Sequence, residues 1–172
     1  TMDAIQYSKS PVAMTHANSR TVCNHHRNKT DEELKALAEK GGVVGVETMP
    51  THVSNKRDPT VEDLLNHIDY MTDLMGVDHV GIGLDLTDGF QENRAHWERY
   101  VESAFGQIKY TKQRFPDRFG VFEDFYNVRH CIHSYLDLPL LTQGLIARGY
   151  SDNEIQKILG KNWLNLLRRV IE

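Results

Sequence analysis

Short apolar runs alternate with helical patterns along the first half of the chain. Residues 11–15 (PVAMT), 43–46 (VVGV) and 79–84 (HVGIGL) predict strands. The runs are apolar on both faces, which is typical of parallel strands that helices cover. Between them, two stretches repeat apolar residues three and four positions apart, the spacing of one helix face. The order strand, helix, strand, helix, strand predicts parallel βα units.

Capping signals mark the ends of both predicted helices. Residues 30–33 (TDEE) form a capping box, in which the first and fourth side chains each accept a hydrogen bond from the other's backbone N–H. Glycines 41–42 should stop that helix. Residues 60–63 (TVED) are an acidic variant of the same box, and Gly76 should end the second helix. We therefore expect helices from residue 31 to about 40 and from 61 to about 75.

The second half of the chain is less regular. A polar loop follows Asp85, residues 97–108 predict a third helix, and residues 90–134 are expected to form an irregular insertion. A further capping box stands at residues 151–154 (SDNE), and an apolar pattern over residues 163–171 predicts a closing helix. A helix before the box should present one apolar stripe made of Leu140, Leu141, Leu145 and Ile146.

Size and composition favour one α/β domain. The 172 residues are 40% hydrophobic and 26% charged, an ordinary mixture that can bury a core. Three strands are too few for a closed eight-stranded barrel, which takes roughly 250 residues. They can form a small open sheet, or they can be the last third of a barrel.

The net charge and the lengths of the apolar segments argue against some classes of binding partner. The net charge is −4 with both signs mixed, and no block of Lys or Arg occurs, so a nucleic acid or an anionic membrane is not expected. No apolar stretch approaches the ~20 residues that span a bilayer. Cys23 and Cys131 form no C-x-x-C pair, which predicts free thiols and slightly favours a cytoplasmic location. Because the sequence starts at Thr1, the lack of a signal-like segment indicates no compartment.

An ionisable residue follows each predicted strand. These residues are His16, Glu47 and Asp85. Loops at the carboxyl ends of parallel strands carry the sites of α/β folds, so three such residues on one rim form the main functional signal. Each alone is weak. A single histidine is more often structural, a glutamate can cap the next loop, and an aspartate often begins a turn.

Residues 25–28 (HHRN) precede the first capping box. Adjacent histidines in a loop point in different directions, so both are expected to be solvated rather than to chelate a metal. The Arg27 guanidinium can hold a carboxylate with two hydrogen bonds, which suits the free C-terminus of a short peptide. Met71 and Met75 are expected in the core.

A second metal-capable group is His130, Cys131 and His133. It has close spacing but no second matching pair, so a hydrolase of unrelated type with a metal there is a minor alternative. The sequence holds no glycine-rich phosphate loop, no H-E-x-x-H and no G-x-S-x-G.

Several motifs occur in an order that resembles the membrane (renal) dipeptidase family of zinc peptidases. They are PVAMTHAN (11–18), HHRN (25–28), TDEELKALAEKGGVVGV (30–46), HIDYM (67–71), GVDHVGIGLD (76–85), DLP (137–139), RGYS (148–151) and ILGKNWLNLLRRV (158–170). The resemblance spans nearly the whole chain except about residues 90–134. It implies that residues 1–172 are a single partial domain, the C-terminal part of a TIM-like (α/β)8 barrel. About three βα units and C-terminal helices would belong to it.

The same resemblance implies zinc-dependent hydrolysis of dipeptides, and some members of the family open β-lactam rings. Two zinc ions, bridged by a carboxylate and a water, would lower the pKa of that water and polarise the scissile carbonyl. His16 stands where the family has a histidine ligand of the second zinc. Arg27, followed by Asn28, stands where an arginine grips the substrate carboxylate. Asp85 stands where an aspartate acts as general base and then acid.

The sequence also departs from the family pattern. Thr15 and Ala17 replace serines on either side of the ligand histidine, and residues 85–89 (DLTDG) hold one residue more than the family's D-F-D-G. Thr48 and Met49 stand where the family often has an aromatic pair, so side-chain selectivity is expected to differ.

Most of the family's metal ligands have no counterpart in these residues. An H-x-D pair, a bridging glutamate and another histidine would lie upstream, and one imidazole cannot build a dinuclear site. We therefore expect the chain alone to be inactive. The alternative is a non-catalytic half-barrel that binds peptides through Arg27 or pairs with another chain. Unpaired edges of a partial barrel favour a homo-oligomer or association with the missing N-terminal half.

Overall fold

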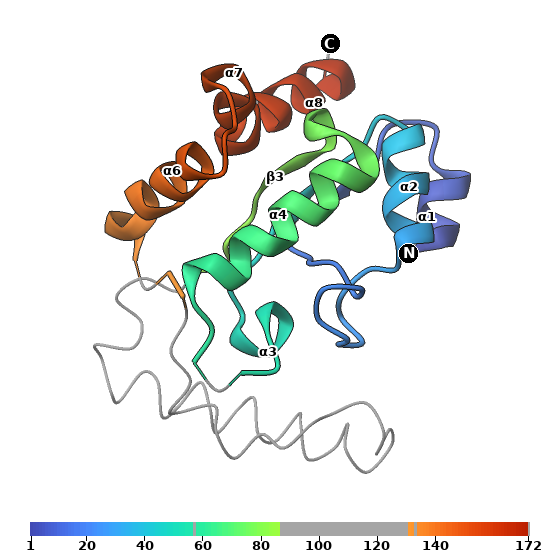
Figure 1. The fold of residues 1–172 in the computed structure, drawn as a ribbon. Coiled ribbons are helices and arrows are strands. Elements are labelled where there is room, and N and C mark those ends of the chain that lie inside the picture. Colours follow the sequence, from blue (N-terminus) through green and yellow to red (C-terminus); the bar gives the residue numbers. More distant parts are fainter. Residues whose placement is uncertain (57, 87–130, 133, 172) are drawn as a thin grey trace, which may run out of the picture.

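A three-stranded parallel sheet forms the centre of the molecule (Figure 1). The computed structural model describes residues 1–56, 58–86, 131–132 and 134–171. The strands are β1 (Ala13–Met14), β2 (Val43–Val46) and β3 (Val80–Ile82), in the order β1-β2-β3. Their parallel pairing confirms the predicted βα units and the α/β class. That this sheet is part of a barrel stays a prediction.

Two of the strands are shorter than their apolar runs. Only Ala13 and Met14 of the first run pair with β2, opposite Val43 and Val44. The third run begins with a 3-10 turn, η1 (Val77–His79), so pairing starts only at Val80. β2 has the predicted bounds, and its three valines are fully buried.

The capping boxes set the helix starts as predicted. α2 (Asp31–Glu39) follows Thr30 and α4 (Val61–Met75) follows Thr60, and in both boxes the two reciprocal hydrogen bonds are present. α4 packs on β2 and β3. Met71 and Met75 are buried, which confirms their place in the core. Figure 1 shows α4 lying along the sheet with α2 beside it.

Two short helices were not predicted. α1 (Met2–Tyr7) packs against α2 through the buried Ile5. α3 (Pro50–Val53) is a single turn that starts at a proline and follows β2 directly. Neither is long enough to show a helical repeat in the sequence.

The C-terminal helices are η4 (Tyr135–Asp137), α6 (Leu138–Ala147), α7 (Asp152–Gln156), the π-helical turn η5 (Lys157–Lys161) and α8 (Asn162–Ile171). α6 packs on α4, whereas η5 and α8 pack on β3. The Asn162 amide donates to the carbonyl oxygens of Val77 and Val80, each at 2.7 Å. The Trp163 indole lies against Gly81, where a Cβ would stand 2.5 Å from its Nε1. These contacts fix the start of α8 on β3.

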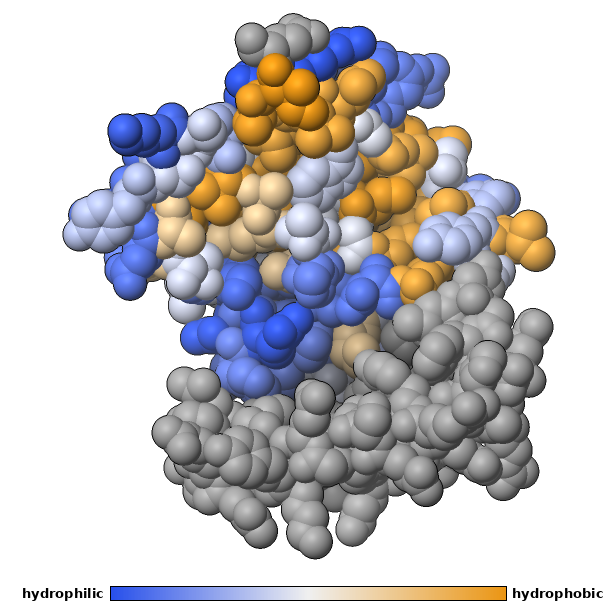
Figure 2. Space-filling model, turned by 180° about the vertical axis from the view of Figure 1, so that it is seen from behind, coloured by the Kyte–Doolittle hydropathy of each residue, from blue (hydrophilic) through white to orange (hydrophobic). Residues whose placement is uncertain are grey.

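The predicted single stripe on the helix before residue 151 is wrong. Leu141 and Leu145 of α6 are buried, whereas Leu140 and Ile146 are 45% and 58% exposed. Successive helical residues point about 100° apart, so neighbours at 140–141 and 145–146 cannot all face the core. α8 is similar: Leu166 is buried, while Leu164, Leu167, Val170 and Ile171 are exposed. Apolar side chains are extensive on the face shown in Figure 2.

Several expectations fall outside the described residues. The helix over 97–108, most of the insertion over 90–134, and both histidines of the group at 130–133 are among them. Cys23 and Cys131 are free thiols, as predicted. Within the part of the chain that is described, no helix is both long and apolar enough to cross a bilayer.

Candidate active site at the carboxyl edge of the sheet

The residues that follow the three strands lie at one edge of the sheet, because the strands are parallel. His16 and Asp85 are exposed there. Glu47 is different: it is 1% exposed and turns into the protein. The predicted rim therefore presents two reactive side chains to solvent and holds the third beneath them.

His16 lies where the backbone of the first strand run leaves the sheet for two residues. Met14 pairs with Val44, and pairing resumes where the N–H of Ala17 donates to the Gly45 carbonyl at 2.8 Å. Thr15 and His16 form the excursion, much as the extra residues of a bulge re-aim a side chain. The His16 Nδ1 lies 2.9 Å from the Thr15 hydroxyl, so Nε2 is the ring atom left for a ligand.

Two glycines let this excursion cross the neighbouring strands. A Cβ on Gly83 would stand 1.8 Å from the Thr15 carbonyl oxygen, and one on Gly45 would stand 2.5 Å from it. The Thr15 carbonyl thus occupies the space of both missing side chains. This close approach brings the residue before His16 to the segment after β3, two residues before Asp85.

Asp85 has an uncommon backbone conformation. Its φ is 57°, the only positive value at a non-glycine residue in the described ranges. Aspartate tolerates this left-handed region better than most residues, and such conformations gather at functional sites.

Arg27 lies on the loop between β1 and α2. Its side chain is exposed, and its guanidinium makes no hydrogen bond or ion pair to the described residues. Arg20 from the same loop is used internally, since it donates to the carbonyl oxygens of Asn28 and His26 at 3.0 and 2.8 Å. Of these two arginines, Arg27 is therefore the one available to a ligand.

Asn28 does not present its amide to a ligand. The residue is fully buried, and its Nδ2 donates to the carbonyl oxygens of Cys23 and His52, both at 2.8 Å. A direct contact between Asn28 and a substrate does not fit this burial. Its amide instead fastens the Arg27 loop to α3.

Asn18 fastens the end of β2 in the same way. Its Oδ1 accepts from the Glu47 N–H at 3.1 Å, and its Nδ2 donates to the Glu47 carbonyl at 3.0 Å and the His52 carbonyl at 3.4 Å. Asn18 and Asn28 thus share the carbonyl of His52. The two amides join the Arg27 loop, β2 and α3 into one buried unit.

His67 supports the same unit from α4. It is fully buried, its Nδ1 accepts from the Ser19 N–H at 3.2 Å, and its Nε2 donates to the Val53 carbonyl at 2.8 Å. Burial lowers the pKa of His67, and a neutral ring is what one donor and one acceptor require. The sequence motif HIDYM included this histidine but indicated no role for it.

Glu47 lies against a row of imidazole rings. Its Oε1 is 2.9 Å from Nδ1 of His52, and the His52 and His25 ring centroids are 4.4 Å apart. His25 in turn stacks on His26 at 4.3 Å. His26 is exposed, as expected of both loop histidines, but His25 is half-buried. The prediction of two solvated histidines is therefore wrong for His25.

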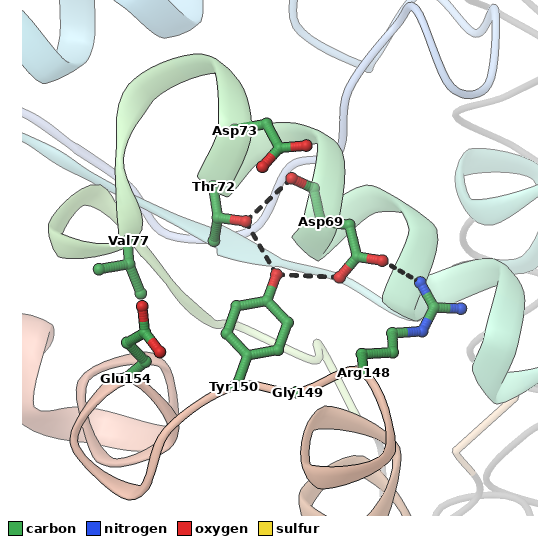
Figure 3. A pocket seen from close by; sticks show the side chains of 8 residues that line it. All are labelled: Asp69, Thr72, Asp73, Val77, Arg148, Gly149, Tyr150 and Glu154. Carbon is green, nitrogen blue, oxygen red and sulfur yellow. Dashed lines mark hydrogen bonds and ion pairs between the residues drawn. The ribbon is translucent and has the colours of Figure 1, made fainter.

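A separate polar hollow of about 440 Å³ lies between α4 and the loop after α6 (Figure 3). The Tyr150 hydroxyl donates to Asp69 at 2.9 Å, and Arg148 pairs with both Asp69 and Glu62. Val77, just before β3, also lines it, so it sits toward the amino end of the sheet. Burial and Asp69 raise the pKa of Tyr150 to about 12. The central polar groups bind one another, so this hollow is a weaker candidate site.

Sequence comparisons show which known proteins the whole chain is similar to. A family model described as membrane dipeptidase, peptidase family M19, matches residues 1–105. An uncharacterized protein in the pqqA 5' region of Klebsiella pneumoniae is 29% identical over 172 residues, covering 98% of this chain and 50% of that protein. Dipeptidase ataJ of Aspergillus terreus is 31% identical, covering 98% of this chain and 33% of that protein.

Solved structures give the same result for the fold. An amidohydrolase from Pseudomonas aeruginosa has a TM-score of 0.70 and 28% identity, with 98% of this chain and 48% of that chain covered. A metallopeptidase from Rhodobacter sphaeroides, solved with a phosphinate mimic of L-Ala-D-Ala, has a TM-score of 0.70 at 24% identity, covering 98% and 38%. The chain spans half or less of the length of these proteins.

Proposed function

The chain belongs to the membrane dipeptidase family, and from this premise we propose that it forms one part of the active site of a zinc-dependent dipeptidase. The observation that carries the proposal is the carboxyl edge of the sheet. There His16 and Asp85 are exposed, and Arg27 stands on the adjoining loop with an exposed guanidinium that pairs with none of the described residues. These groups match a metal ligand, a proton-transfer group and a carboxylate binder in chemistry and exposure.

His16 fits a metal through one atom only. Its Nε2 is left open by the Nδ1 contact with Thr15, but the described residues contain no group of three or more side chains that could hold a metal ion. From the family resemblance, we infer that residues upstream of His16 in the family pattern supply the other ligands. Bound zinc ions would activate a water and polarise the substrate carbonyl.

Arg27 and Asp85 would handle the substrate itself. The Arg27 guanidinium would bind the C-terminal carboxylate of a dipeptide with two charge-assisted hydrogen bonds. The Asp85 carboxylate would accept a proton from the attacking water and then deliver one to the leaving amine. Asn28 would act indirectly, by holding the Arg27 loop on α3.

Selectivity for the substrate side chain would depend on Met49 rather than on Thr48. Thr48 is fully buried, and both its N–H and its hydroxyl donate to the Leu84 carbonyl, at 3.2 and 2.8 Å. Met49 is partly exposed at the same edge. A flexible thioether in place of an aromatic side chain would accept varied residues.

The test uses two preparations, the 172-residue chain alone and the same chain combined with the N-terminal half of the Klebsiella pneumoniae relative. With zinc present, the combined protein should hydrolyse dipeptides, and a chelator should abolish turnover. Asp85→Asn should lower kcat by roughly 100-fold or more with little change in KM. Zinc-dependent turnover by the chain alone at the combined protein's rate would show that its metal ligands have been misjudged.

The rival function is peptide binding without hydrolysis. It is favoured by two findings for the described residues: Arg27 is exposed and pairs with none of them, and they hold no full set of metal ligands. In that case both preparations would bind a dipeptide through its carboxylate, and neither would cleave it.

A further inference from the structure

We propose that Glu47, His52 and His25 form a buried acid–imidazole row that positions Arg27. The proposal rests on the assignment of Arg27 as the residue that binds the substrate carboxylate. None of the three row residues contacts the substrate in this account. They act through the backbone of Arg27, which the row holds at its outer end.

The row starts at Glu47, which the end of β2 carries into the interior. The residue is 1% exposed, and its backbone is held at both N–H and carbonyl by Asn18. Its Oε1 lies 2.9 Å from Nδ1 of His52, within ion-pair distance, and neither atom has a hydrogen-bond partner among the described residues. A buried carboxylate needs a compensating partner, and His52 is the partner that this arrangement offers.

His52 is held from two sides. Its ring faces Glu47, and its carbonyl oxygen accepts from the amides of Asn18 and Asn28. It lies in the single turn of α3, which is too short to be rigid by itself. These side-chain contacts therefore give α3 a defined position, and the His52 ring becomes a fixed surface for the next ring.

His25 connects that surface to Arg27. Its ring stacks on His52, and its Nδ1 accepts a hydrogen bond from the Arg27 N–H at 3.3 Å. Only an unprotonated Nδ1 can accept. Burial, followed by the positive charges of His52, His26, Arg27 and Arg20, lowers the pKa of His25 to about 4. The ring is therefore neutral near pH 7, and the acceptor is present.

At Arg27, the row holds the backbone in place and leaves the side chain exposed. The N–H of Arg27 is held by His25, and the carboxamide of the next residue, Asn28, is buried. The guanidinium remains exposed. A binding group on a loop gains affinity when its backbone is already in the bound position, because less freedom is lost on binding.

Two variants of His25 test separately its Nδ1 acceptor, which binds the Arg27 N–H, and its ring, which lies against His52. His25→Phe keeps a ring to stack on His52 but has no acceptor, and His25→Asn offers an amide oxygen as acceptor without the ring. Asn24→Ala, in the exposed part of the same loop, is the control. Glu47→Gln keeps shape and removes the charge at the other end.

In the combined enzyme, His25→Phe and Glu47→Gln should raise KM for dipeptides roughly five- to tenfold with kcat little changed. His25→Asn should restore part of the loss, and Asn24→Ala should leave KM within about twofold of the unchanged protein. A purely structural role would lower kcat and stability together, without rescue by Asn.

NMR on the labelled 172-residue chain gives a readout that does not need activity. The ¹⁵N shifts of the His25 ring should show an unprotonated Nδ1 and a protonated Nε2 at pH 7. The Arg27 amide should exchange with solvent roughly five- to tenfold faster in His25→Phe than in the unchanged chain. Equal Arg27 exchange in the two proteins overturns the proposal, even if Glu47→Gln fails to fold.

The two proposals fail differently. If Arg27→Ala leaves KM unchanged, the role of Arg27 in binding substrate is wrong, whatever the exchange data show. If Arg27→Ala raises KM but His25→Phe and Glu47→Gln do not, only the positioning row is wrong.

Discussion

Two clusters of polar side chains in the molecule are built differently. At the carboxyl edge of the sheet, Asn18, Asn28 and His67 are fully buried and bind backbone groups. Along α4, Arg148 pairs with Asp69 and Glu62, whose side chains are 38% and 71% exposed. Buried polar groups are costly when a partner is lost, whereas exposed ion pairs contribute little.

The difference in burial between the two clusters corresponds to the parts of the protein that each cluster holds in place. The buried groups at the carboxyl edge fasten three separate segments under His16, Arg27 and Asp85, which face solvent. The ion pairs along α4 tie that helix to the loop after α6. A site that must keep reactive groups in fixed positions gains from the rigid arrangement, and the outer layer has no such need.

The largest expected effect comes from breaking the buried unit. Asn18→Ala removes three hydrogen bonds and leaves the buried N–H of Glu47 without its acceptor. We expect the free energy of unfolding to fall by about 3 kcal/mol in urea titration. The control is Asn24→Ala in the exposed part of the same loop, which should change stability by less than about 0.5 kcal/mol. Equal effects of the two variants would remove the contrast between the two regions.

Acid should also act on the buried region. The folded-state pKa values of His67 and His25 lie below their usual value, chiefly because of burial. The unfolded chain therefore binds these protons first, and stability is full above about pH 6.5 and declines as pH falls toward the folded-state values. We expect His25 to account for a loss of about 1 kcal/mol by pH 4.5, allowing for solvent screening, and His67 to add a loss in the same direction.

Urea titrations at several pH values measure this decline. His25→Asn cannot titrate, so it should flatten the curve by the His25 share. A curve for His25→Asn with the same slope as the unchanged chain would mean that His25 is not held neutral by its surroundings.

The smallest effect is expected at the outer cluster. Arg148→Ala removes ion pairs with Glu62 and Asp69, yet it should cost only about 1 kcal/mol or less. Part of that cost should disappear at 1 M salt, because exposed charges are screened. A loss as large as that of Asn18→Ala would show that the outer cluster is as rigid as the buried one.

Local signals in the sequence predicted local structure. The boxes that open α2 and α4 involve residues only three positions apart, so their hydrogen bonds could be predicted from residue type. The parallel order followed from the alternation of apolar runs with helical periods. The stripe on α6 was misjudged because neighbouring leucines were assigned to one face without regard to the helical turn.

The buried support of the site could not be predicted in the same way. His67 binds Ser19 from 48 positions away, and Asn18 binds Glu47 from 29 positions away. His25 was expected in solvent because it lies in a loop. Its partial burial comes from His52 of α3, a contact that only the folded chain makes. The roles proposed for His16, Arg27 and Asp85 came from the family resemblance rather than from the pattern of residues.

The central claim is that Arg27 binds a substrate carboxylate above the rigid edge of the sheet. The most direct measurement compares kcat/KM for a dipeptide with that for the same dipeptide bearing a C-terminal amide, in the combined enzyme. The unchanged enzyme should prefer the free carboxylate by roughly 10- to 100-fold, and Arg27→Ala should lose that preference. Arg168→Ala, an exposed arginine on α8, should keep it. An equal preference in Arg27→Ala and the unchanged enzyme would contradict the account.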